Sequence, residues 1–155
     1  MLSYATFKSI HMLGVALFLG NIIVTGVWKY HADKTGNPVV VGFAQRLVTL
    51  TDWVFTAGGA ALIVIGGYGM AAVAGYDLTH TSWLLWAQGF FIASGVIWAL
   101  ILIPIQIKQA KLAHAFEAGG AIPDLYWRLN RYWYFWGIAA TLLPLANLYV
   151  MVAKP

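Results

Sequence analysis

One histidine lies inside an apolar stretch that is long enough to cross a lipid bilayer. The stretch runs from Ser3 to Trp28, and His11 falls in its first half. An ionisable side chain at that depth is costly unless it is hydrogen-bonded, paired or bound to a metal. Two interpretations of His11 therefore stand side by side: an imidazole that hydrogen-bonds a neighbouring helix, and a ligand of a metal or haem.

Small residues accompany this histidine at helical spacing. Gly14 follows His11 on the same helical face, and Gly59 and Gly66 share one face of a second, glycine-rich apolar stretch. A face of glycines allows close approach either by another helix or by a flat macrocycle. The packing of two helices is the commoner use of such a face, and a haem pocket is the alternative.

Further residues that could bind a cofactor or a metal are predicted at a similar depth. Met70 offers a thioether that would either pack or ligate a soft metal, and His80 lies in the loop above it. Lys8, before His11, offers a cation near the membrane surface. The candidate cofactor-binding residues are His11, Lys8, Gly14, Gly59, Gly66, Gln88 and Asn147, and the candidate metal ligands are His11, Met70 and His80.

Four apolar segments must position these residues. Of the 155 residues 61% are hydrophobic and 9% are charged, and the mean hydropathy is +0.76, which is typical of an integral membrane protein. A helix of about 20 residues crosses the hydrocarbon core. The sequence predicts an all-α, four-helix transmembrane bundle that forms a single domain over residues 1–155. The expected spans are about 3–28, 53–73, 83–107 and 132–152.

The basic residues set the expected orientation of the bundle. Most of them fall in the first and third connections between spans, which the positive-inside rule assigns to the cytoplasm. Both termini are therefore predicted on the non-cytoplasmic side. The net charge of +4 is explained by these flanking residues, so no nucleic-acid partner is expected. The absence of cysteine excludes disulfides and thiolate sites.

The connection before the second span carries two further expectations. Residues 29–38 are predicted to form a polar link, with Pro38 in the first turn of the next helix. Asp52 is expected at the membrane border, in an ion pair with Arg46 or Lys29. The first segment lacks a basic start before its apolar core, and we expect it to be retained rather than cleaved.

The opening of the chain resembles known membrane-protein families. Residues 7–15 read FKSIHMLGV, and this pattern with Lys8 and His11 resembles the first helix of HemJ-type protoporphyrinogen oxidases and of CopD-like copper-resistance proteins. The chain is more similar still to a family of predicted bacterial integral membrane proteins of unknown function, in which this pattern and the Thr-Asp-Trp of residues 51–53 recur. That likeness covers the whole chain and implies a multi-pass protein of the bacterial cytoplasmic (inner) membrane.

The HemJ resemblance implies a cofactor and an activity. It implies haem b, with His11 as axial ligand, in a protein that transfers electrons or oxidises a quinone-accessible or porphyrin-like substrate. Lys8, three residues before His11 towards the membrane surface, is a cation that could meet the propionates of such a haem. This chain departs from the HemJ pattern at Gln88, where HemJ proteins have a lysine, and at Arg131, where they have a carboxylate. One alternative is a copper-handling protein of the CopD-like type. The other is a non-enzymatic membrane subunit, an assembly protein or a homo-oligomer.

Overall fold

The computed structural model describes residues 2–155, so Met1 of the predicted domain lies outside the described residues. The described chain is all-helical, with four long rods that are apolar enough to cross a membrane. Two of these rods contain a short π-helical segment, and the other two are continuous α-helices. The elements are α1 (Tyr4–Lys34), α2 (Pro38–Thr51), η1 (Asp52–Ala57), α3 (Gly58–Ala74), α4 (Ser82–Ile97), η2 (Trp98–Leu102), α5 (Ile103–Glu117) and α6 (Asp124–Ala153).

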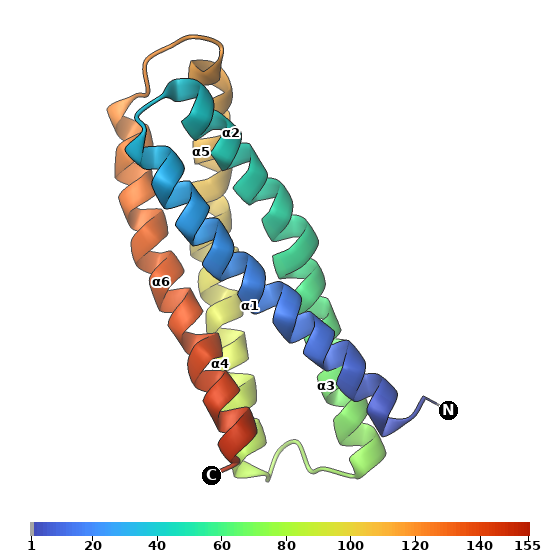
Figure 1. Ribbon diagram of the computed structural model, residues 1–155. Coiled ribbons are helices and arrows are strands. Elements are labelled where there is room, and N and C mark those ends of the chain that lie inside the picture. The colour runs from blue at the N-terminus through green and yellow to red at the C-terminus, as the bar shows by residue number, and fades with distance from the viewer. Residues whose placement is uncertain (1) are drawn as a thin grey trace.

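The four rods are arranged as two pairs that are joined at one end. Helix α1 packs along α3 and α4 packs along α6, while α2 packs on α5 and connects the pairs. Figure 1 shows that α1 and α6 lie close together near the α1–α2 loop and diverge towards the opposite end. Both termini lie at that opposite end, together with the 75–81 loop. An arrangement of four rods with both termini at one end confirms the predicted four-helix bundle.

Local sequence signals account for where the helices begin and end. Ser3 caps α1 by accepting a hydrogen bond from the Thr6 backbone N–H at 3.2 Å, and Asn37 caps α2 in the same way. Gly75 ends α3 with a positive φ of 68°, which glycine adopts without strain. The polar link predicted at 29–38 is too long, because α1 continues through Lys34.

The glycine face of the second rod is used to pack α1 directly against α3. A Cβ on Gly66 would lie 2.5 Å from the backbone N of His11, and one on Gly14 would lie 2.8 Å from the carbonyl O of Gly59. A Cβ on Gly59 would lie 2.9 Å from the backbone N of Phe18. Only hydrogen atoms fit at these three points, so the two helix backbones touch there.

This contact predicts that Gly66→Ala destabilises the bundle. The methyl group would press on backbone atoms of His11, which cannot move aside as a side chain can, and such overpacking costs about 1–3 kcal/mol. We expect a lower midpoint of thermal unfolding in detergent. Gly20→Ala is the matched control, because a Cβ at Gly20 meets no atom within 4 Å. An equal effect of both substitutions would contradict the assigned contact.

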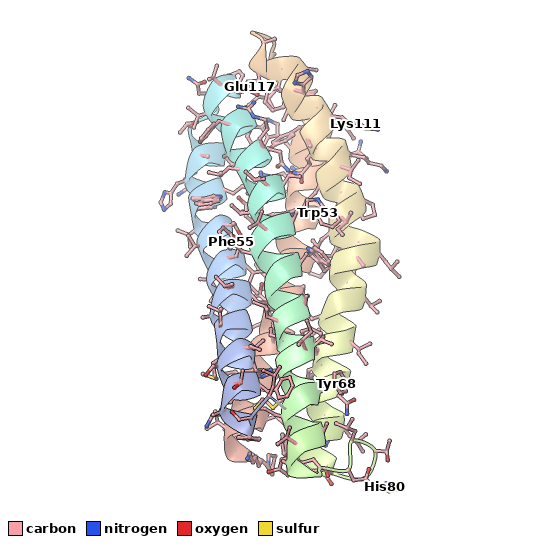
Figure 2. All side chains as sticks on the ribbon, turned by 90° about the vertical axis from the view of Figure 1, so that its right-hand side faces the viewer. Trp53, Phe55, Tyr68, His80, Lys111 and Glu117 are labelled. Atoms are coloured by element: carbon pink, nitrogen blue, oxygen red, sulfur yellow. The ribbon has the colours of Figure 1, made fainter. Side chains whose placement is uncertain are left out.

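Most of the outer surface of the rods is apolar, as a lipid-facing surface must be. Figure 2 shows Trp53 and Phe55 on the outer side of η1, and these side chains are 58% and 40% exposed. Arg46 forms an ion pair with Glu117 between α2 and α5, near the loop end of the bundle. The polar side chains of the rods are therefore concentrated inside the bundle or at its ends.

Candidate functional site

A cavity of about 790 Å³ lies between the two helix pairs. Its wall includes Ile23 and Val27 from α1 and Ile138 and Leu142 from α6, and each of these four side chains is at least 46% exposed. Because these exposed wall residues lie on α1 and α6, the cavity opens sideways between these helices. The mouth falls midway along α6, so a ligand would enter the cavity from the lipid.

Both π-helical segments border this cavity. Segment η1 contributes Asp52 and Thr56, and η2 contributes Trp98, Ala99 and Leu102. A π-helical turn inserts an extra residue into a helix and occurs frequently at functional sites. The segment η2 ends just before Ile103 and Pro104, and Pro104 cannot donate a backbone hydrogen bond to the preceding turn. The two irregular turns therefore face the same space from different rods.

Asp52 is the buried carboxyl group of the cavity wall. Its side chain accepts hydrogen bonds from Gln106 Nε2 at 2.5 Å, from Asn21 Nδ2 at 3.0 Å and from Thr56 Oγ1 at 3.0 Å. These donors come from α5, α1 and η1 itself, so this one group joins three elements. The predicted interfacial ion pair of Asp52 is wrong: Arg46 pairs with Glu117, and Lys29 pairs with Asp33.

Asp52 lies deeper in the bundle than the sequence predicts because a long helix precedes it. Fourteen helical residues of α2 precede Asp52, which places it about 21 Å along the rod from the α1–α2 loop. Asp52 is only 7% exposed, so it lies within the bundle rather than at its border. An ionisable group inside a membrane bundle is by default a candidate for function.

Two tryptophans of the cavity wall have an unused hydrogen-bond donor. Trp98 Nε1 and Trp133 Nε1 are buried and have no partner among the described residues. A buried indole N–H normally finds an acceptor. Phe18 and Phe91 add aromatic walls. The site thus combines aromatic surface and a carboxyl acceptor, with two N–H donors behind its wall that have no partner within residues 2–155.

A second polar cluster adjoins the cavity at the loop end. Lys29 is fully buried and lies 3.2 Å from Asp33 Oδ2, and it donates to the Tyr126 hydroxyl at 2.9 Å. Asp33 Oδ2 also accepts from Asn130 Nδ2 at 2.8 Å and from the Tyr134 hydroxyl at 2.9 Å. Because Tyr134 also lines the cavity, it connects the cluster with the cavity wall.

The structure brings His11 together with the three predicted glycines, but in the contact between α1 and α3. The His11 Nδ1 donates to the backbone carbonyl of Ile63 across 2.9 Å, which is the hydrogen bond that one of the two interpretations predicted. Gly14, Gly59 and Gly66 are covered by the opposing backbone. The glycines therefore leave no space for a porphyrin between the two helices.

The other predicted site residues are dispersed. Gln88 accepts a hydrogen bond from the Tyr68 hydroxyl at 3.0 Å, and Lys8 is exposed. Asn147 is partly buried on α6, with an Oδ1 atom that has no partner among the described residues. Met70 lies near the end of α3. In the described chain, the cavity is lined by none of these residues, nor by His11, Gly14, Gly59 or Gly66.

His80 belongs to a surface turn. Its Nδ1 lies 2.9 Å from Asp77 Oδ2, its side chain is 82% exposed, and Figure 2 shows it in the loop that follows α3. Hydrogen bonds from the Thr79 hydroxyl and backbone N–H lower the pKa of the Asp77 carboxyl, with a contribution from His80. Residues 2–155 contain no group of three or more His, Asp or Glu side chains placed to hold a metal ion.

The cavity could not be foreseen from the sequence, although some of its polar surroundings could. Asn21 and Thr25 follow His11 at helical spacing, and both face the interior of the bundle: Asn21 donates to Asp52, and Thr25 is only 2% exposed. One sequence feature does indicate a buried carboxyl group: Asp52 lies among apolar residues and has no basic residue next to it. No sequence pattern indicates that the indole N–H groups of Trp98 and Trp133 lack a partner in the part of the chain that the structure describes.

The comparisons with known proteins agree with a membrane protein and add no activity. Residues 5–155 match a family described as "Predicted integral membrane protein (DUF2269)". No curated protein and no solved structure matches the chain.

Proposed function

We propose that this chain, which belongs to the DUF2269 family of predicted integral membrane proteins, binds a lipid-soluble, quinone-like molecule in the cavity beside Asp52. The observation that carries the proposal is the position of a buried carboxyl group on the wall of a cavity that opens towards lipid. A concave site with apolar walls and a few polar groups is the usual form of a small-molecule site.

The size and the shape of the cavity suit a flat ring with an apolar tail. Its volume of about 790 Å³ lies within the range of about 300–1,000 Å³ that is common for small-molecule pockets. Aromatic side chains would contact the ring, and the sideways mouth between α1 and α6 would let a tail remain in the lipid. A water-soluble ligand would have no comparable route through this mouth.

The polar groups match the chemistry of quinones and quinols. The carbonyl oxygens of a quinone accept hydrogen bonds, and the N–H groups of Trp98 and Trp133, which are buried behind the wall of the cavity, would donate to them if the indole rings turn towards the ligand. The hydroxyl groups of the reduced form donate, and Asp52 is the acceptor in the wall. One site could therefore hold both forms of the ligand through different groups.

Filling the cavity should abolish this binding without harming the fold. A Cβ on Gly95, which lines the cavity, meets no atom within 4 Å, so Gly95→Leu would project into the open space. We expect the affinity for a short-chain quinone, measured by quenching of tryptophan fluorescence in nanodiscs, to fall at least tenfold. That change corresponds to about 1.4 kcal/mol.

Gly89→Leu is the matched control for this experiment. Gly89 lies on the same helix, its Cβ also meets no atom within 4 Å, and it does not line the cavity. We expect its quinone affinity to stay within twofold of the unsubstituted protein. Equal quenching of all three proteins would show that the quinone does not occupy the cavity.

Haem b is a second proposal, which rests on the resemblance and on the orientation of the His11 ring; such a haem would have to lie outside the contact between α1 and α3, which the glycines fill. The bond from His11 Nδ1 to a backbone carbonyl is the kind of contact that orients a ligating histidine, and it leaves Nε2 free. A Soret band that His11→Ala removes and His80→Ala retains would support haem binding. A colourless, folded protein would overturn it. Redox activity, copper handling, a homo-oligomer and the bacterial inner membrane likewise stay predictions.

A further inference from the structure

We propose that the polar cluster around Asp33 forms an aqueous vestibule through which water and protons reach the cavity from the loop end of the bundle. A quinone-like ligand that changes between carbonyl and hydroxyl forms must exchange protons with water. The role of the vestibule in moving protons therefore rests on the proposed binding of a quinone-like ligand. The geometry itself is independent of the identity of the ligand.

The first observation is a second hollow next to the cavity. It has a volume of about 470 Å³ and shares Tyr30, Tyr134 and Ile138 with the cavity wall. Its remaining lining residues are Asp33, Lys34 and Asn130, all polar. Asp33 and Lys34 belong to the last turn of α1, so the hollow lies next to the α1–α2 loop, at the loop end of the bundle.

The second observation is the position of Tyr134 between the two spaces. Its side chain borders both the cavity and the hollow, and its hydroxyl donates to Asp33 Oδ2 at 2.9 Å. Asp33 is also bonded to Lys29 and Asn130, so side chains of both α1 and α6 hold the carboxyl group in place. Tyr134 therefore lies between the cavity and the vestibule, together with Tyr30 and Ile138, and it is the one of the three that is bonded to Asp33.

The third observation is that the cluster has unused polar atoms. Gln45 Nε2 and Gln109 Oε1 belong to fully buried side chains and have no partner among the described residues. Gln45 Oε1 accepts from Tyr126, and Gln109 Nε2 donates to Asn130, so both amides are part of the cluster. Buried polar atoms of this kind are the usual partners of internal water.

The charged and titratable groups at the vestibule come from two helices. Lys29, Tyr30, His31, Asp33 and Lys34 are on α1, and Tyr126 and Tyr134 are on α6. Lys29 is paired with Asp33, and Lys34 Nζ lies 4.5 Å from the centre of the Tyr30 ring. The opening therefore carries no large excess of one charge, which suits the passage of water and protons better than the binding of a strongly charged headgroup.

The absence of cysteine from the chain permits a direct test of water access. Gly137 lines the cavity and its Cβ would meet no atom within 4 Å, so Gly137→Cys would report whether water reaches the cavity. Only a hydrated thiolate reacts rapidly with a charged, membrane-impermeant methanethiosulfonate reagent. The control is Ile92→Cys, at an apolar position 60% exposed on α4 and away from the cavity.

We expect Gly137→Cys in nanodiscs to react at least tenfold faster than Ile92→Cys. Adding Tyr134→Ala should raise the rate of Gly137→Cys at least a further fivefold and leave the rate of Ile92→Cys unchanged. Equal slow rates at both positions, with no effect of Tyr134→Ala, would overturn the vestibule. The assay contains no quinone, so it decides the vestibule whether or not quinone binding is found.

Discussion

Replacing Asp33 with leucine is expected to destabilise the protein by about 3–5 kcal/mol, because it breaks a buried ion pair by removing one partner. Lys29 is fully buried and lies within 3.3 Å of both Asp33 oxygens, so the substitution leaves a buried ammonium group without its counter-charge. Asn130 and Tyr134 lose an acceptor at the same time. The midpoint of thermal unfolding in detergent measures the loss.

A double substitution separates the ion pair from the packing around it. Lys29→Met with Asp33→Leu removes both charges, and replacing a buried pair by apolar residues is often close to neutral. We therefore expect the double variant to be more stable than Asp33→Leu alone. Lys34→Met, at an exposed neighbouring position, should change stability by no more than about 0.5 kcal/mol. Lys29→Met is measured alone as well. A loss of stability in the double variant equal to the sum of the losses in the two single variants would show that the charges do not interact.

The second large effect is expected at Asp52. Asp52→Asn keeps the size of the side chain but exchanges one acceptor oxygen for an N–H group, which would oppose one of the donors Asn21, Thr56 and Gln106. Loss of the hydrogen bond from a quinol hydroxyl group to this carboxyl group costs about 1.5–3 kcal/mol when the carboxyl group is ionised. We expect the affinity for a short-chain quinol to fall roughly 10- to 150-fold, as measured by titration in nanodiscs.

A matched control keeps this result specific. Asp77→Asn makes the same chemical change at an exposed loop position outside the cavity. Its quinol affinity should equal that of the unsubstituted protein. If Asp52→Asn binds quinol with undiminished affinity while the cavity-filling variant does not, the carboxyl group serves the fold rather than the ligand.

The helices could be predicted from the sequence because their signals are local. Apolar length predicts the rods, Asn37 with Pro38 marks the start of α2, and Gly119 with Pro123 marks the break before α6. The end of α1 was missed because Lys29 and Asp33 look like a polar loop in sequence. In the structure they form an i,i+4 pair inside a helix.

The candidate site was less predictable because it depends on how the rods pair. A glycine face can pack against a helix or a cofactor, and the sequence does not distinguish between these two uses. In the structure, Gly59 and Gly66 pack against the backbone of α1. Asp52 was placed at the border because the second span was counted from Trp53. The rod that contains it begins at Pro38, and this moves Asp52 inside the bundle.

The most direct measurement of the central claim is a quinone titration of the unsubstituted protein beside Gly95→Leu and Gly89→Leu in nanodiscs. We predict saturable quenching of tryptophan fluorescence in the unsubstituted protein and in Gly89→Leu, and at least a tenfold weaker response in Gly95→Leu. Quenching that rises without saturation, or that is identical in all three proteins, would contradict a ligand site in the cavity beside Asp52.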